Sequence, residues 1–375
     1  MGVTERIARA CAARPGRVFA AWGLTLLASV LAIVFLLRGL TTDALLTNEP
    51  ESDRALEILE EAFPADPERT VSDLMVVRSD TLTVEDRRRF RSFVERLTGE
   101  LQASGAVGRA TTYWNELDPA LVSGDRHATL VLLAIPSEDA AAEVVDTVEA
   151  RGEDPVFDVA VAGNETLDHD FNLLSERDLQ EGELQFGLPA ALLILLLVFG
   201  TVVAGVVPLL MAIFSIVVAL GLVAVLSQAF DLSIFVVNML TGMGLALGID
   251  YALFVISRYR EERAVTRAPG DAIATSGATA SRAVLFSGSA FVVAMFGMLL
   301  VPSTIMRSLA AGAILVGVTS VLAALTLLPA ILGVLRDRVD RLRVPFVGRG
   351  RGGEGRYWHA IVSRMNVRPR TKAKT

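Results

Sequence analysis

The chain has 375 residues, of which 52% are hydrophobic, yet it carries 42 acidic and 35 basic side chains. The two classes are segregated into long uncharged blocks and charged ones, and the mean hydropathy is +0.50. This pattern excludes an ordinary soluble globular protein and indicates an integral membrane protein with a large water-exposed part. The net charge of −7, with the basic residues next to apolar blocks, gives no support to nucleic-acid binding.

Six apolar segments are long enough to cross a bilayer, because about 20 helical residues at about 1.5 Å each span the hydrocarbon. In chain order they are 18–37, 184–203, 206–226, 234–256, 283–301 and 309–335. The first is too long for a cleaved signal peptide and has no small-residue cleavage site before Arg38, so we expect an uncleaved anchor. We expect a tight turn near Gly205 and Pro208 between the second and third spans.

Arginine marks one side of the membrane. The N-terminal segment 1–17, the loop 258–282 inside the bundle 184–335, and the tail 336–375 are rich in Arg and fall on one side, which we expect to be cytoplasmic. The segment 39–183 carries 33 acidic residues against 12 arginines, a net of −21, and is expected outside. These features predict a multi-pass protein of a bacterial cytoplasmic membrane. High Arg and Ala content with almost no Lys favours an actinobacterium.

The outer segment has its own pattern of strands and helices. Strands are predicted at 72–78, 107–113, 128–135 and 157–162, and helices at 83–103 and 137–150. The first helix opens with a capping-box arrangement at Thr83–Asp86. The order strand-helix-strand-strand-helix-strand is that of a ferredoxin-like domain. A further helix over 164–183 is expected to lead into the second span.

The fourth span carries a lone carboxylate, Asp250. An Asp at the centre of a spanning helix costs about 2.5–3.5 kcal/mol even on lenient insertion scales, so such groups are rare and functional. Apolar surroundings disfavour the charged form, which allows the group to take up and release protons. Asp250 is therefore a candidate proton carrier.

Tyr251 follows directly, either as a hydroxyl partner for a carboxylate or as a residue that packs between helices. Successive helical positions point about 100° apart, so we expect the partner of Asp250 on another helix.

Small and hydroxylated residues surround this pair. Gly242, Gly244 and Gly248 predict close helix packing that would bring the carboxylate to its partner. Ser287 and Ser289 of the fifth span either line a polar path or bond to their own backbone.

A longer motif surrounds the carboxylate. It is G-I-D-Y-A-L-F followed by S-R-Y-R-E-E, over residues 248–262, and it is accompanied by D-L-S-I-F-V-V-N at 231–238 and L-L-P-A at 327–330. With one span, a large outer domain and five more spans, the chain resembles the N-terminal half of a transporter of the MMPL family, in the RND superfamily. The resemblance covers nearly the whole chain.

That resemblance implies a fold of six transmembrane helices plus an extracytoplasmic α+β ferredoxin-like porter domain inserted between the first two. It also implies export of lipids or other hydrophobic molecules, driven by protons that pass through Asp250 and Tyr251. In the family this pair works against a second Asp-Tyr pair in a tenth span, which this chain lacks.

Two interpretations of that absence stay open. Residues 356–369 resemble the amphipathic segment that would lead into a seventh span. The chain is then either a truncated gene product or a half that pairs with another copy or another chain. The alternative function is a truncated or self-pairing half that senses lipids or acts as a scaffold without transport.

Other activities find less support. An intramembrane aspartyl protease needs two carboxylates at one site, and no second Asp or Glu lies inside the six spans, so we expect no enzyme. No Walker-type motif indicates ATP, and no Cys/His cluster indicates a metal or another cofactor. The expected partners are a hydrophobic substrate, protons, the membrane and a second transporter half or a second copy.

Overall fold

The computed structural model describes residues 2–37, 40, 48, 50–62, 66, 70–151, 154–266 and 268–342. The chain divides into two compact units, one formed by Met1–Leu45 with Asp178–Thr375 and the other by Leu46–Arg177.

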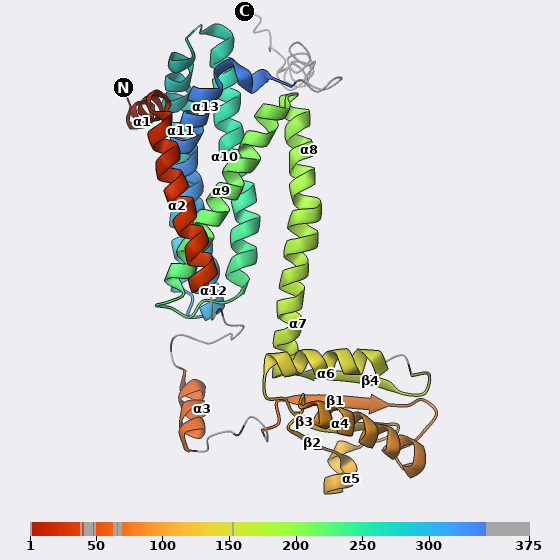
Figure 1. Cartoon of the computed structure of the whole chain (residues 1–375). Helices are drawn as coiled ribbons and strands as arrows, with labels where there is room; N and C mark the ends of the chain where they lie inside the picture. Colours follow the sequence, from red (N-terminus) through yellow and green to blue (C-terminus); the bar gives the residue numbers. More distant parts are fainter. Residues whose placement is uncertain are drawn as a thin grey trace, which may run out of the picture. The chain divides into compact units, whose positions relative to one another are not determined.

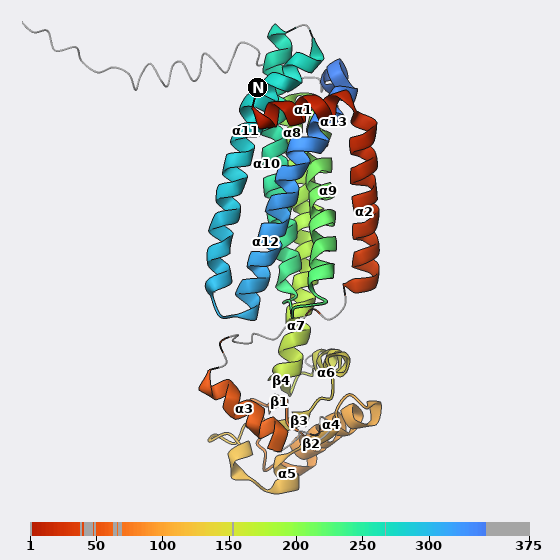
Figure 2. The same cartoon turned by 90° about the vertical axis from the view of Figure 1, so that its left-hand side faces the viewer.

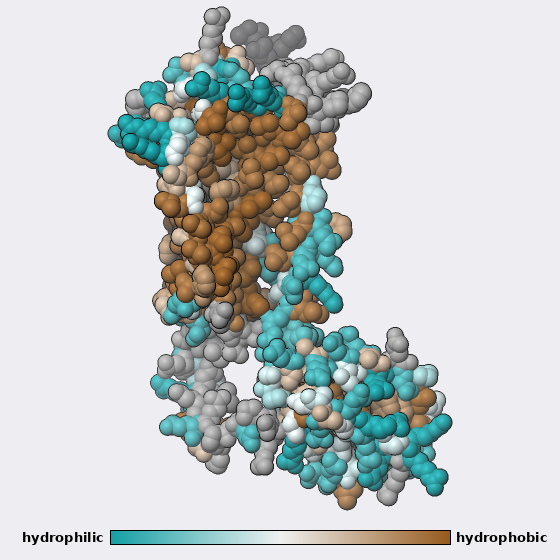
Figure 3. All heavy atoms as spheres, viewed as in Figure 1, coloured by the Kyte–Doolittle hydropathy of each residue, from teal (hydrophilic) through white to brown (hydrophobic). Residues whose placement is uncertain are grey.

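The first unit is a helical bundle in which, among the described residues, six helical segments are long and apolar enough to span a membrane, as expected (Figure 1). Its long helices are α2 (Pro15–Leu36), α8 (Leu188–Phe199), α9 (Val202–Leu226), α10 (Phe235–Val265), α11 (Pro269–Phe296) and α12 (Thr304–Leu322). Shorter helical segments extend two of these helices. The segment η4 (Gly297–Leu300) follows α11, and the segments η5 (Ala323–Leu327), α13 (Leu328–Leu335) and η6 (Arg336–Asp340) continue α12. Hydrophobic residues cover the side of the bundle seen in Figure 3, as contact with lipid requires.

The turn between the second and third spans lies at Gly200 and Thr201, so the expectation of a turn near Gly205 and Pro208 is wrong. Gly200 has φ +65° and ends α8 in the left-handed conformation that glycine favours. Gly205 and Pro208 lie inside α9. Gly205 instead permits close packing, because a Cβ there would lie 3.4 Å from the backbone nitrogen of Leu196 in α8.

The segment 258–282, expected to be a loop, is mostly helical. Helix α10 reaches Val265 and α11 begins at Pro269. Ion pairs of Arg258 with Glu261 (2.8 Å) and Glu262 support the extended end of α10, because residues three and four apart are neighbours on a helix.

The tail expected over 336–375 is described only as far as Leu342, and the segment 356–369 lies outside the described residues.

A short amphipathic helix, α1 (Val3–Ala13), precedes the first span and lies across the ends of α11 and α13 (Figure 2). Its Ala8 is buried against Gly277 of α11, where a Cβ would lie 2.6 Å from the Ala8 Cβ. At Gly333 of α13, a Cβ would lie 2.9 Å from the Ala12 carbonyl oxygen. The two glycines let this end of the bundle accept a crossing helix.

The second unit contains a four-stranded antiparallel sheet with the order β2-β3-β1-β4. Its elements are α3 (Glu51–Ala62), β1 (Asp73–Arg78), η1 (Arg87–Arg91), α4 (Ser92–Ser104), β2 (Arg109–Thr111), α5 (Tyr113–Glu116), η2 (Pro119–Leu121), β3 (Ala128–Ala134), α6 (Glu138–Arg151), β4 (Asp158–Gly163) and α7 (Asn164–Arg177). Each predicted strand and helix of this segment is present in the predicted order, but the first helix begins at Arg87, so the expected helix start with a capping box at Thr83–Asp86 is wrong. Alternate residues of β1 are buried, and Phe93 stacks on Phe157 at 4.1 Å in the core.

A buried carboxylate links β1 to the start of α7. Asp73 accepts hydrogen bonds from the Thr166 backbone N–H (3.1 Å) and hydroxyl (2.7 Å), which satisfies part of the first helical turn. Gly163 allows this approach, since a Cβ there would lie 2.4 Å from the Asp73 Cα. Helix α7 continues through the π-helical segment η3 (Asp178–Gly187) into α8, so the helix from Asn164 to Phe199 has no break at residue 184.

Candidate functional site

Asp250 lies at the middle of α10. This helix has 31 residues from Phe235 to Val265, and Asp250 is the sixteenth. The arginines of the motif lie nearer its C-terminal end. The carboxylate is therefore well inside a segment long and apolar enough to span a membrane.

The Asp250 side chain lies on an exposed row along α10. Gly242, Ala246, Asp250 and Phe254 are all exposed, and their spacing of four places them along one face. We call these four residues the Asp250 face. Within the part of the chain that the structure describes, no hydrogen bond or ion pair joins Asp250 to another residue. A carboxylate at this depth needs a polar partner or water, and the described residues supply no such partner to Asp250.

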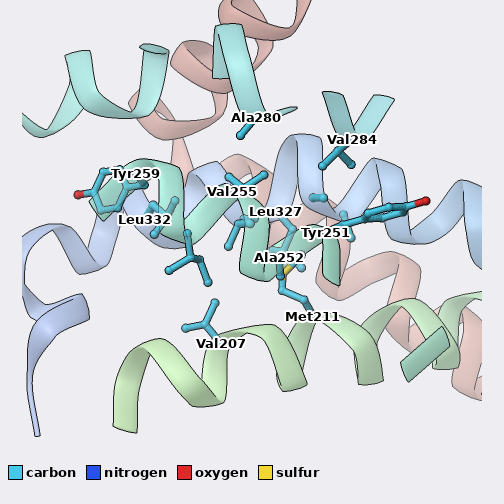
Figure 4. Packing of buried hydrophobic residues seen from close by; sticks show 14 of the residues in the cluster. Val207, Met211, Tyr251, Ala252, Val255, Tyr259, Ala280, Val284, Leu327 and Leu332 are labelled. Carbon is cyan, nitrogen blue, oxygen red and sulfur yellow. The ribbon is translucent and has the colours of Figure 1, made fainter. Parts of the chain in front are cut away.

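Tyr251 points away from that face. Its side chain is buried at the edge of a hydrophobic cluster, beside Val284 of α11 (Figure 4). The hydroxyl has Ser287 of α11 as a hydrogen-bond partner. At Gly288, a Cβ would lie 3.3 Å from the Tyr251 hydroxyl oxygen, so the glycine lets the hydroxyl reach α11. Tyr251 thus has its partner on another helix.

The two serines differ. Ser287 donates to the Val284 carbonyl at 3.3 Å in its own helix and is also a hydrogen-bond partner of Tyr251. Both serines are exposed, but among the described residues no hydrogen bond joins Ser289 to Tyr251. The structure brings together only one of the two serines with the tyrosine.

Two of the three glycines pack α10 closely against its neighbours. A Cβ at Gly248 would lie 2.5 Å from the Ala212 Cα in α9. A Cβ at Gly244 would lie 2.3 Å from Ile216 of α9 and 3.0 Å from Val316 of α12. The helices are closely packed at these two positions. Both glycines are buried, whereas Asp250 is exposed, so this packing holds the back of α10 and does not bring the carboxylate to a partner.

Gly242 has a different neighbour. A Cβ there would lie 3.1 Å from Oε1 of Glu183, which is in η3, and the Glu183 carboxyl hydrogen-bonds the Thr241 side chain. Sequence reasoning missed Glu183, because it placed this residue at the last position of the outer segment. The available signal was an acidic residue immediately before an apolar run. A π-helical segment, such as the one that holds Glu183, often occurs at functional sites.

Arg260 of the motif and Arg263, which directly follows the motif, hold one end of the bundle together. Arg260 donates to the Phe199 carbonyl at 3.0 Å, lies 5.6 Å from the centroid of the Phe199 ring, and pairs with Asp340 at 2.8 Å. Arg263 pairs with Asp337. These two arginines join the end of α10 to the end of α8 and to η6.

Comparison with known proteins agrees with this architecture. The model of the MMPL family matches residues 44–372. The mycolic acid-containing lipids exporter MmpL11 of Mycolicibacterium smegmatis is 28% identical over 364 residues, which is 94% of this chain and 37% of that protein. The heme uptake protein MmpL11 of Mycobacterium tuberculosis is 38% identical over 158 residues, which is 42% of this chain and 16% of that protein.

A solved structure shows the same fold. The hedgehog release protein Disp from the water bear Hypsibius dujardini aligns with a TM-score of 0.57 at 14% identity, over 89% of this chain and 48% of that one. The chain thus spans less than half of the length of each of these proteins.

Proposed function

This chain belongs to the MMPL family, and we propose that it is one half of a proton-driven exporter of lipids or other hydrophobic molecules. The observation that carries the proposal is a single carboxylate, Asp250, at mid-helix in an apolar span. Such a group is costly in a membrane and is kept for a function, of which proton movement is the best fit. The names of two relatives, a lipid exporter and a heme uptake protein, support a hydrophobic cargo.

The second unit fits the role of a porter domain. Its strand order β2-β3-β1-β4, with a helix after β1 and another after β3, supports a ferredoxin-like domain inserted between the first and second spans. Its excess of acidic residues and the arginines at the opposite ends of the spans support an extracytoplasmic position in a cytoplasmic membrane.

The Asp250 face supports a second half as partner. Ala246 leaves the helix backbone open to close approach, and the carboxylate between it and Phe254 needs a facing polar group. A second copy of this chain or a separate half would supply it. The MmpL11 protein of Mycolicibacterium smegmatis, of which the matched region covers 37%, supports this arrangement.

Replacement of Asp250 by Asn tests the mechanism. The full chain, with any second half that copurifies with it, is reconstituted in proteoliposomes with an entrapped pH dye and a fluorescent long-chain lipid as cargo. We expect Asp250→Asn to reduce both proton influx and cargo movement to the level of empty liposomes, because the Asn side chain does not bind and release a proton near neutral pH. The matched control is Asp231→Asn, an exposed acid just before α10. Undiminished proton influx in Asp250→Asn would refute the mechanism.

The alternative is a half that senses lipids or acts as a scaffold without transport. The lack of a partner for Asp250 within the described chain favours it. Its signature would be lipid binding by the wild-type chain with no proton influx at any pH.

A further inference from the structure

Glu183 is an acidic side chain from a different helix that reaches α10 eight to nine positions before Asp250. It hydrogen-bonds Thr241 and lies against Gly242, where the missing side chain leaves room for the carboxyl group. A Cβ at Gly242 would come within 3.1 Å of the Glu183 Oε1. The contact joins η3 and α10, which belong to the same unit of the fold.

The Thr241 hydroxyl suits both protonation states of this carboxyl. Its Oγ1 lies 3.0 Å from the Val237 carbonyl and 3.0 Å from the Asn238 carbonyl. With its hydrogen donated to either carbonyl, the oxygen can accept from a protonated Glu183. With its hydrogen turned the other way, the hydroxyl can donate to the carboxylate. A carboxyl that keeps its hydrogen bond in either state exchanges protons without losing its position.

The Glu183 contact lies on the Asp250 face. Gly242 belongs to that row, and eight residues at about 1.5 Å each separate its level from that of Asp250 by about 12 Å. The only residue of the row between them is Ala246, whose side chain is a methyl group. This separation is too long for two carboxyls that share one proton, but a short chain of water molecules can bridge it.

Few other charged groups act on Glu183. Asp178, about one helical turn earlier in η3, is the titratable group whose charge influences Glu183. The charged residues of α10 begin only at Asp250 and continue from Arg258 to Arg263 at the other end. Asp250 is therefore the nearest acid along this helix.

We propose that Glu183 is a proton-uptake residue, which collects protons at the N-terminal end of α10 and passes them along the Asp250 face to Asp250. The Thr241 hydroxyl positions it. This inference rests on the proposed proton-driven function. It adds the group through which the proton enters, and a proton released by Glu183 is taken up by the Asp250 carboxylate.

The test compares Glu183→Gln with Glu181→Gln, an exposed acid two residues earlier in the same helix. Initial proton influx is measured in the proteoliposomes described above, with the second unit facing the medium and the pH of that medium varied. We expect Glu183→Gln to lower the rate about tenfold or more in alkaline medium, where proton supply limits the rate, and to approach the wild-type rate in acidic medium. Glu181→Gln should match the wild type throughout.

Two results would overturn the inference. One is a Glu183→Gln rate equal to the wild type at every pH while Asp250→Asn remains blocked. The other is a loss in Glu183→Gln that does not respond to the pH of the medium, which indicates a structural role for the Glu183–Thr241 contact. A thermal unfolding curve for each variant identifies chains that have lost the fold. If Asp250→Asn itself still conducts protons, the proposed function fails independently of Glu183.

Discussion

Asp250 and Tyr251 are neighbours in sequence, but their side chains lie on different surfaces of α10. The rotation of about 100° per residue places the carboxylate on the exposed face and the tyrosine against α11. The tyrosine hydroxyl meets Ser287, and Gly288 gives it the space. The pair therefore places a carboxylate on the Asp250 face and a hydrogen-bonded hydroxyl at the α10–α11 interface.

Tyr251→Phe tests that connection at the residue scale. The ring keeps its packing while the hydrogen bond to Ser287 is lost, so we expect a stability change of about 1 kcal/mol and a several-fold fall in proton influx. The matched control is Tyr259→Phe, a fully buried tyrosine two turns further along α10. Equal influx in the two variants would show that the Tyr251 hydroxyl has no part in proton movement.

Helix α10 has two faces with different tasks. Its buried face uses Gly244 and Gly248 to approach α9, and its exposed face carries the carboxylate. At its C-terminal end, Arg260 fixes the helix to α8 through the Phe199 carbonyl. The helix is thus held from behind and at one end, while the Asp250 face stays open to a partner.

Gly248→Ala tests the close packing at the scale of the element. The new methyl group would lie 2.5 Å from the Ala212 Cα, which is backbone and cannot turn aside, so α9 and α10 must separate. We expect a loss of about 1–3 kcal/mol, measured by thermal unfolding in detergent. Gly23→Ala in α2 is the control, because its Cβ would meet nothing within 4 Å, and it should be neutral or stabilising. Equal unfolding temperatures in both variants would contradict this account of the packing.

At the scale of the whole molecule, the chain contains two compact units and spans less than half of the length of MmpL11 of Mycolicibacterium smegmatis and of Disp. The bundle buries the back of α10 but leaves its carboxylate uncovered. In a membrane this arrangement favours association, because lipid cannot satisfy a carboxylate.

A cysteine at Ala246 tests that association. The single native cysteine is first removed by Cys11→Ser. Because burial raises the pKa of the Cys11 thiol, this thiol is already a poor nucleophile. We expect Ala246→Cys to cross-link in native membranes, to a second copy or to a separate half, as seen from the mass of the product on a denaturing gel. The control is Val34→Cys in α2. Val34 is 60% exposed, and a cysteine at this position should not cross-link. Equal yields at both positions would argue that the Asp250 face has no specific partner.

Local patterns were sufficient for much of this structure. The six spans, the order of the strands and helices in the second unit, and the position of Asp250 all follow from hydropathy and periodicity, which depend on residues close in sequence. The turn at Gly200 was missed because Pro208 gave a stronger local signal than a glycine that ends a helix. The segment 258–282 was expected to be a loop, but its first residues are helical because ion pairs keep α10 helical beyond its apolar part.

The sequence alone determined the class of protein and the existence of a mid-membrane carboxylate, since both are properties of continuous segments. Only the tertiary structure decided which groups meet. The contact of Glu183 with Thr241, the contact of Tyr251 with Ser287 and the exposure of Asp250 each depend on which helices are neighbours and how each is rotated. These contacts join residues 36 to 58 positions apart, and the hydropathy of a single helix carries no information about its rotation against another when both are apolar on nearly all sides.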